Sequence, residues 1–179
     1  DARAFEEILL ALEELSPGVA PLRPGLCALR VGNFYGSESE AAAVLAERLV
    51  DLGVWDVRFG VADGLFAAEQ AARQAQAQDV LIVPAGESAA FLSGLPIEVL
   101  DDPLLASLLR RMGLTTLGAF ARLAPADVHT RFGSHGALLH CYTRGLDPHP
   151  ISRRSVPPEL TAALTLGAPV LNGECLPEP

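Results

Sequence analysis

The sequence predicts an α+β fold in which a sheet covered by helices is followed by a small all-helical region. Helical and strand-like patterns alternate from residue 3 to residue 83, and only short helical patterns occur between residues 87 and 144. Such an alternation is typical of an α/β or ferredoxin-like layer. We therefore expect one domain over 1–85, a helical domain over 86–150 and a third segment over 151–179.

The elements of the first region follow from the spacing of apolar residues, which repeat every 3.6 residues in helices and every two in strands. They are a helix at 3–15, a mostly buried strand at 19–31 with a break near residue 24, a helix at 38–52, a strand at 55–62, a helix at 64–77 and a short buried strand at 80–83. The face of the strand at 55–62 carries Trp55, Val57, Phe59 and Val61. Pro24 and Gly25 cause the break, because neither residue suits the interior of a buried strand.

The second region reads as short helices joined by turns that contain glycine. The expected helices are 88–93, 104–112, one from Thr115 or Thr116 to about 123, one from Pro125 to about 133, and one from Ser134 to 145. Asp102 and Pro103 are suited to the N-cap and first position of the helix at 104–112. Prolines and polar residues at 146–158 predict an extended linker, and 159–171 is again strand-like.

Composition restricts the function. The chain of 179 residues has a net charge of −9, and residues 1–85 hold 13 acids against 6 arginines. A protein that binds nucleic acid by itself usually has a basic face, and this count gives the first region none. No apolar run is long enough to span a bilayer, and the acidic start is unlike a signal peptide, so we expect a soluble cytoplasmic protein without membrane contact.

No cofactor or metal motif is present, so we expect neither. His129, His135, His140 and Cys141 lie close in sequence, but their spacing matches no common zinc site. The chain contains no lysine, which excludes a Walker motif. The turn at 131–136, RFGSHG, has two interpretations: backbone N–H groups of Gly133, Ser134, His135 and Gly136 hold a phosphate, or the glycines only join two helices.

Six segments, taken together, resemble the Y-family (translesion) DNA polymerases. They are SPGVAPLRPGLCALRV at 16–31, GVADGLFAAEQAA at 60–72, AAFLSGLPIEVL at 89–100, GLTTLGAFARL at 113–123, RFGSHG at 131–136 and RGLDPHPI at 144–151. They follow the family's order and cover most of residues 1–151. The resemblance implies the C-terminal part of a palm over 1–85, a thumb over 86–150, and a linker with the start of a little-finger-like segment over 151–179.

The chain departs from the family pattern where that pattern carries chemistry. The family's S-I-D-E segment falls on Arg23, Pro24, Gly25 and Leu26, so Gly25 and Leu26 replace the acidic pair that holds the catalytic metals. Two lysines of the family pattern become Leu65 and Glu69. A G-[IV]-G turn that contacts DNA becomes Asp101, Asp102 and Pro103.

These departures resemble the ImuB group, the non-catalytic Y-family homologues of the bacterial mutasome. The resemblance implies a pseudoenzyme that acts in DNA repair, translesion synthesis and SOS mutagenesis through protein contacts. The implied partners are an error-prone C-family DNA polymerase, a RecA-related accessory protein and the sliding clamp, with weak DNA binding. The alternatives are an active polymerase with relocated metal ligands, for which Glu13, Glu14 and Asp63 are the nearby acids, and a small α/β metabolite-binding domain.

Overall fold

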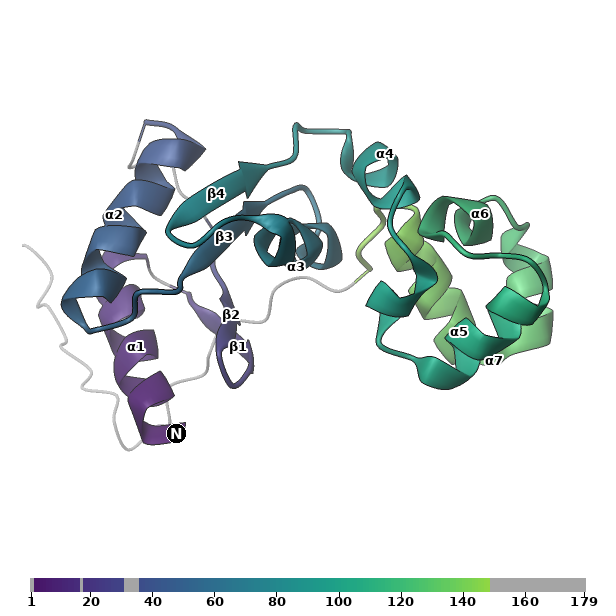
Figure 1. The fold of residues 1–179 in the computed structure, drawn as a ribbon, viewed down its shortest axis with the longest axis horizontal. Coiled ribbons are helices and arrows are strands. Elements are labelled where there is room, and N and C mark those ends of the chain that lie inside the picture. The colour runs from purple at the N-terminus through teal and green to yellow at the C-terminus, as the bar shows by residue number, and fades with distance from the viewer. Residues whose placement is uncertain (1, 17, 31–35, 149–179) are drawn as a thin grey trace, which may run out of the picture.

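The computed structural model describes residues 2–16, 18–30 and 36–148, which form an α+β chain with a separate helical lobe (Figure 1). The elements are α1 (Ala2–Leu15), β1 (Ala20–Arg23), β2 (Leu26–Ala28), α2 (Glu38–Asp51), β3 (Arg58–Val61), α3 (Leu65–Gln74), β4 (Asp79–Ile82), α4 (Ser88–Ser93), the 3-10 helix η2 (Ile97–Leu100), α5 (Pro103–Arg111), α6 (Leu117–Ala121) and α7 (Pro125–Thr143). None of the described helices is both long and apolar enough to cross a membrane. The predicted strand-like stretch at 159–171 lies outside the described residues.

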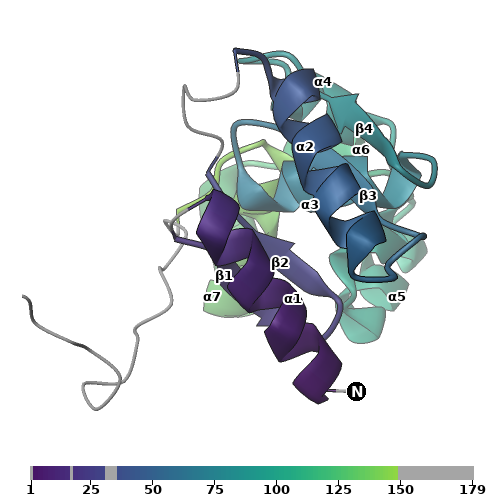
Figure 2. The ribbon, with the colours of Figure 1, turned by 90° about the vertical axis from the view of Figure 1, so that its left-hand side faces the viewer.

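The strands form two separate pairs. β1 and β2 are antiparallel, with Ala20 opposite Ala28, and β3 and β4 are parallel, with Arg58 opposite Asp79. Helices α1 and α2 lie side by side against the strands, as Figures 1 and 2 both show. Helix α3 packs on β3 and also contacts α4, so it lies between the strands and the helical lobe.

The expectation of one interrupted strand over 19–31 is wrong, because the segment is a hairpin. Arg23 ends β1 and lies opposite Leu26 at the start of β2, so Pro24 and Gly25 form the turn between them. Gly25 has a φ of 82°, a left-handed conformation that glycine adopts without a steric penalty. Proline followed by such a glycine is the sequence of a type II turn. The residues that seemed to break a strand therefore reverse the chain.

The strand expected at 55–62 is shorter than predicted. β3 begins at Arg58, after a bend at Asp56, whose carboxylate accepts a hydrogen bond from Arg58 Nε at 3.1 Å. Val57 and Phe59 still pack against the sheet-side apolar residues, but the bend leaves Trp55 64% exposed. The alternation that placed Trp55 on the buried face is therefore wrong for that residue.

Side chains cap the N-termini of α2, α5 and α6. Asp102 Oδ1 accepts a hydrogen bond from Leu105 N at 2.9 Å, with Pro103 at the first position of α5. Thr116 caps α6 in the same way, and Ser37 caps α2. The last two expected helices meet at Gly133, whose φ of 66° and ψ of −169° interrupt α7.

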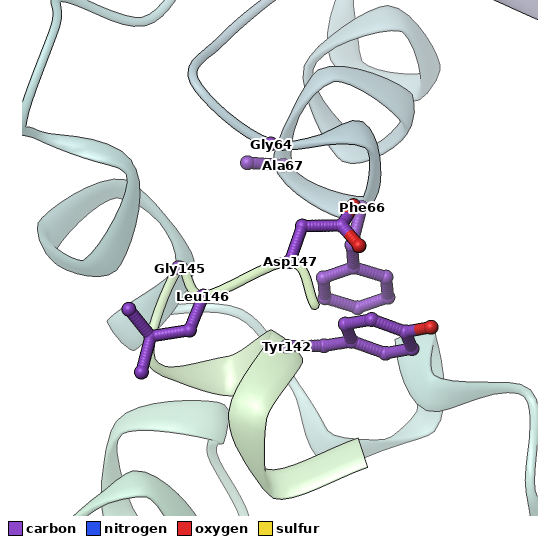
Figure 3. Close-up of a pocket in the computed structure, with 7 residues that line it drawn as sticks. All are labelled: Gly64, Phe66, Ala67, Tyr142, Gly145, Leu146 and Asp147. Carbon is purple, nitrogen blue, oxygen red and sulfur yellow. The ribbon is translucent and has the colours of Figure 1, made fainter. Parts of the chain in front are cut away.

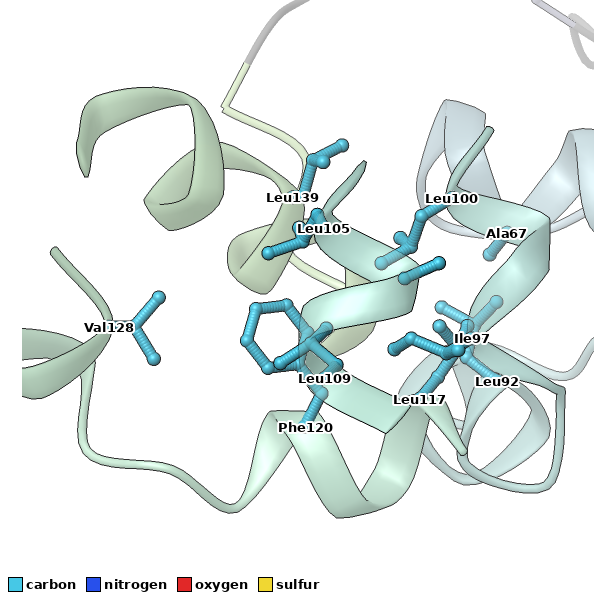
Figure 4. Packing of buried hydrophobic residues seen from close by; sticks show 11 residues of the cluster. Ala67, Leu92, Ile97, Leu100, Leu105, Leu109, Leu117, Phe120, Val128 and Leu139 are labelled. Atoms are coloured by element: carbon cyan, nitrogen blue, oxygen red, sulfur yellow. The ribbon is translucent and has the colours of Figure 1, made fainter. Parts of the chain in front are cut away.

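Apolar side chains gather in two clusters. The helical cluster, shown in Figure 4, consists of Ala67, Leu92, Ile97, Leu100, Leu105, Ala106, Leu109, Leu117, Phe120, Val128 and Leu139. The sheet-side cluster consists of Leu9, Leu12, Val19, Leu45 and Leu49. Ala67 comes from α3, so this helix contributes a side chain to the core of the lobe that follows it.

An open cavity of about 1100 Å³ separates the two strand pairs. Every residue in 22–30 and 56–65 lines it, and no residue of β4 does. Successive side chains of a strand point to opposite faces, so a cavity that lies over one face contacts only every second residue. Here consecutive residues line the cavity, and we infer that the edges of β2 and β3 face each other across it. The hairpin turn lies at its rim.

Candidate functional site

A chain of ion pairs begins beside the hairpin turn, where the family resemblance aligns Gly25 and Leu26 with an acidic pair. Arg23, at the end of β1, donates to Glu69 on α3. Glu69 also accepts from Arg73, one helical turn further along α3, at 2.8 Å between Nη2 and Oε1. Arg73 in turn reaches Asp101 of the helical lobe, at 3.1 Å between Nη2 and Oδ2. We call these four residues the ion-pair chain.

Within the ion-pair chain, two arginines balance the charges of two carboxylates. Glu69 is the most enclosed member, with a side chain that is 15% exposed, and it has an arginine on two sides. Burial disfavours the charged form of Arg73, but its hydrogen bonds and attraction to Asp101 and Glu69 outweigh this and raise the pKa of Arg73 above its ordinary value. The ion-pair chain joins the β1–β2 hairpin, helix α3 and the turn at Asp101, which are far apart in sequence.

The turn at 131–136 is linked to the helix α5 by a second polar contact. His135 Nε2 lies 3.0 Å from Asp102 Oδ2, while the other oxygen of this carboxylate caps α5. The backbone hydrogen bond from Leu105 lowers the pKa of Asp102 below its ordinary value; burial opposes this shift and His135 adds to it. A carboxylate therefore lies beside the turn for which the sequence offered phosphate binding as one interpretation.

The four residues of that turn have different environments. Gly133 is the kink of α7, and Gly136 is buried so closely against Phe132 that an added Cβ would lie 2.3 Å from Phe132 Cβ. Ser134 is exposed, and the exposed imidazole of His135 faces Asp102. The packing of Gly136 is consistent with the simpler interpretation, a glycine turn between helices.

Two of the three acids named as alternative metal ligands, Glu14 and Asp63, bind other protein groups. Asp63 Oδ2 accepts hydrogen bonds from Gly86 N at 2.7 Å and Ser88 Oγ at 3.3 Å, which fastens the loop after β3 to the start of the lobe. Glu14 pairs with Arg48 across α1 and α2 at 3.1 Å. Within residues 2–16, 18–30 and 36–148, no three His, Cys, Asp or Glu side chains form a group that could hold a metal ion.

The histidines and cysteine that first suggested zinc do not come together. His140 is 1% exposed and packs its ring edge-on to Phe120 at 5.1 Å between centroids. His135 is held by Asp102 instead. These contacts place the two histidines in different environments of the lobe.

Asp147 forms a contact with α3 that the sequence did not indicate. Its Oδ2 accepts a hydrogen bond from Leu65 N at 2.9 Å and so caps α3 from 82 positions away. Beside it the rings of Phe66 and Tyr142 stack, with centroids 5.5 Å apart (Figure 3). Both contacts join α3 to the end of α7. The signal available in the sequence was that Gly64, at the N-cap of α3, offers no side-chain cap.

Comparisons with known proteins give these residues a context. No protein-family model matches the chain. The DNA polymerase IV of Dehalococcoides mccartyi is 30% identical over 156 residues, which are 84% of this chain and 40% of that protein. The DNA polymerase IV of Ralstonia nicotianae is 30% identical over 170 residues, 89% of this chain and 47% of that protein.

Comparison with solved structures points to the same group of proteins as the sequence comparison. DinB from Sulfolobus solfataricus superposes with a TM-score of 0.68 at 17% identity, over 84% of this chain and 46% of that one. A Dbh–Dpo4 chimera of the Y family gives a TM-score of 0.67 at 18% identity, over 86% and 47%. The fold is thus that of the Y-family DNA polymerases. The chain is related to the DNA polymerase IV proteins, and it spans about two fifths to a half of the length of these relatives.

Proposed function

We propose that this chain is the palm and thumb portion of a non-catalytic Y-family polymerase-like protein, an adaptor of the ImuB type that serves translesion synthesis and SOS mutagenesis through protein contacts. The observation that carries the proposal is the ion-pair chain. It begins at Arg23, two residues before Gly25, and includes Glu69, which stands where the family pattern has a lysine.

The composition of the hairpin turn supports the part of the proposal that concerns metal binding. Two-metal phosphoryl transfer requires carboxylate oxygens that hold Mg²⁺ against the reacting groups. Gly25 and Leu26 have no side-chain oxygen, and the φ of 82° at Gly25 is a conformation in which any other side chain is strained. The backbone of the turn thus suits glycine, and this supports the proposal that positions 25 and 26 supply no metal ligand.

The negative charge of Glu69 supports the part of the proposal that concerns nucleotide binding. It stands where the family pattern has a lysine, so a triphosphate in this position would face a carboxylate. Arg23 and Arg73 are close by, but both already bind Glu69. Like charges at close range repel strongly when they are shielded from water, and Glu69 is only 15% exposed.

The thumb residues complete the proposal. Where the family pattern has a glycine turn that contacts DNA, this chain has Asp101 bound to Arg73 and Asp102 bound to His135. Two carboxylates beside a DNA backbone weaken electrostatic binding. The proposal therefore assigns only weak, salt-sensitive DNA binding to this portion and gives its main role to protein partners in the cytoplasm. These are an error-prone C-family polymerase, a RecA-related accessory protein and the sliding clamp.

The test is primer extension by the full-length protein that contains these residues. With a primer–template, all four nucleotides and either Mg²⁺ or Mn²⁺, we expect no product above the level without enzyme, while the DNA polymerase IV of a relative extends the same primer. Extension that disappears in an Asp63→Asn variant would overturn the proposal and favour an active polymerase with relocated ligands. A melting temperature that matches wild type would show that this variant is folded.

A further inference from the structure

The helical lobe is connected to the rest of the chain by two crossings that meet at one place. The chain enters the lobe at 86–89, after β4, and leaves it at 145–147, after α7. Both crossings form hydrogen bonds with 63–65, which connect β3 to α3. Figure 3 shows Asp147 beside Gly64 at the N-terminal end of α3. We call these three segments the lobe junction.

One carboxylate of the lobe junction comes from the sheet side. Asp63, shortly after β3, accepts two hydrogen bonds at its Oδ2, from Gly86 N at 2.7 Å and from Ser88 Oγ at 3.3 Å. These donors belong to the turn before α4 and to the first residue of α4. A residue of the sheet side therefore holds the entry to the lobe.

The second carboxylate comes from the lobe and acts in the opposite direction. Asp147 Oδ2 accepts a hydrogen bond from Leu65 N at 2.9 Å and so caps α3, whose own N-cap residue, Gly64, has no side chain to do so. The neighbouring Gly145 is packed against α4, because an added Cβ would lie 2.9 Å from Ala89 N. The exit from the lobe is thus fixed to the starts of both α3 and α4.

Helix α3 connects this fastening to the sheet. β3 has Gly60 at a position where any side chain would overlap the backbone of Ala68 and Ala72. The backbones of strand and helix are therefore in direct contact, and α3 has no room to shift on β3. A group that holds α3 consequently holds the sheet as well.

The other contacts between α3 and the lobe restrict its orientation less. Ala67 is buried in the helical cluster and Phe66 stacks on Tyr142, but the burial of apolar surface is non-directional. The ion pair of Arg73 with Asp101 joins side chains that are 41% and 67% exposed, and such pairs contribute little. Hydrogen bonds weaken steeply when they are bent, so the two carboxylates constrain the angle between lobe and sheet most strongly.

We propose that Asp63 and Asp147 form a two-carboxylate staple that fixes the orientation of the helical lobe relative to the sheet. Relative motion is the default for two units joined by a modest interface. The staple opposes this motion because each carboxylate crosses the lobe junction from a different side. Without both acceptors, the apolar contacts of α3 remain and form a hinge about which the lobe turns. The staple acts in the same way whether or not the protein is catalytic, so it goes beyond the proposed function.

Distances between spin labels in the full-length protein test the staple. One pair of labels, on non-natural amino acids at exposed Glu47 of α2 and exposed Ser107 of α5, spans the lobe junction. A second pair, at Ser107 and exposed Ala126 of α7, lies within the lobe. By double electron–electron resonance, we expect narrow distance distributions for both pairs in wild type. The double variant Asp63→Ala with Asp147→Ala should broaden the first distribution about twofold or more and leave the second unchanged.

Two further variants separate these hydrogen bonds from other effects of substitution. Asp63→Asn with Asp147→Asn keeps an acceptor oxygen at each position. It should keep the narrow distribution, because the donors are two backbone N–H groups and a hydroxyl. Glu14→Ala removes a carboxylate from a different long-range contact, that with Arg48, and should change neither distribution.

Several results overturn the inference. They are a broad first distribution in wild type, an unchanged one in the double alanine variant, and a broadening by the asparagine changes or by Glu14→Ala. Broadening of both pairs in the double alanine variant also overturns it, because the effect then lies inside the lobe. If that variant does not fold, Asp147→Ala is measured alone, and an unchanged first distribution in this single variant overturns the inference as well.

Discussion

The two hydrophobic clusters of this chain differ in how completely they are closed. In the helical cluster, Leu92, Ile97, Leu109, Leu117, Phe120 and Val128 are fully buried by neighbouring helices. In the sheet-side cluster, Leu12, Leu45 and Leu49 line the open cavity between the strand pairs. The departures from the polymerase pattern at Gly25, Leu26 and Glu69 also line this cavity. The departures from the family pattern thus lie around an open space and not in the packed core.

The difference teaches that side chains around the open cavity can depart from the family pattern while the fold is kept. Turn formation at Pro24 and Gly25 needs only local backbone geometry, and the charge of Glu69 is balanced by Arg23 and Arg73. The first of three predictions tests how far the two regions differ, and the other two test polar groups of the helical lobe, in order of expected effect.

The largest effect is expected for Phe120→Ala in the helical cluster. Phe120 is fully buried and contacts Phe132 and His140 edge-on, so truncation leaves a cavity with no route to water. We expect a loss of about 3–5 kcal/mol in the free energy of unfolding. The matched change on the sheet side is Leu45→Ala, which should cost about 2 kcal/mol, the low end for leucine, because the site already borders open space. Urea unfolding of both variants measures the difference; equal losses would contradict the comparison.

Local features of this fold were predictable from the sequence and long-range ones were not. The caps at Ser37, Asp102 and Thr116 depend on residues three positions apart, and the structure has each of them. The hairpin was misjudged because alternating apolar residues on both sides of Pro24 and Gly25 fit one strand as well as two. The turn type, read from those two residues alone, would have separated the possibilities.

The candidate site was even less predictable from the sequence than the fold, because its contacts join distant positions. The sequence showed that Gly25, Leu26 and Glu69 lack the expected chemistry, but not what replaces it. Arg23 and Glu69 are 46 positions apart, and Leu65 and Asp147 are 82 apart, so no local pattern connects them. A change from lysine to glutamate at position 69 nonetheless implies a nearby cation, and that requirement could have pointed to an arginine.

A pH-dependent effect of intermediate size is expected at His140. Its ring is buried, and Nε2 has no hydrogen-bond partner among the described residues. Burial lowers the pKa of His140, and the charge of Arg144 lowers it further, against the effect of nearby backbone hydrogen bonds. The unfolded chain therefore takes up a proton first as the pH falls through about 6.5. Stability should decrease below that pH by at most about 1.4 kcal/mol per unit.

Unfolding by urea at pH 7.5 and pH 5.5 measures this dependence. The His140→Leu variant, which is similar in volume, should lose most of it. The exposed His129→Gln variant is the control and should keep it. An equal acid sensitivity in the His140→Leu variant would show that another group is responsible.

The smallest effect is expected at Asp102. Two substitutions of this residue distinguish its role as a helix cap from the role of its charge. Asp102→Ala removes the acceptor for Leu105 N and should cost about 1 kcal/mol. Asparagine also caps helices well, so Asp102→Asn should keep most of the stability while losing the charge beside His135.

The pH dependence of this difference has a definite sign. Because the pKa of Asp102 is lowered in the folded protein, the stabilisation by its charge is present above the unfolded pKa of about 3.9 and is lost as the pH falls through the lower folded value. Thermal unfolding of wild type and Asp102→Asn from pH 7 to pH 3 should therefore converge at the acid end. Asp101→Asn removes the charge that pairs with Arg73 while tolerating the left-handed φ of 55°, and should change stability by less than about 0.5 kcal/mol. If Asp102→Asn were as destabilising as Asp102→Ala, the charge at His135, and not the cap, would be what Asp102 contributes to the lobe.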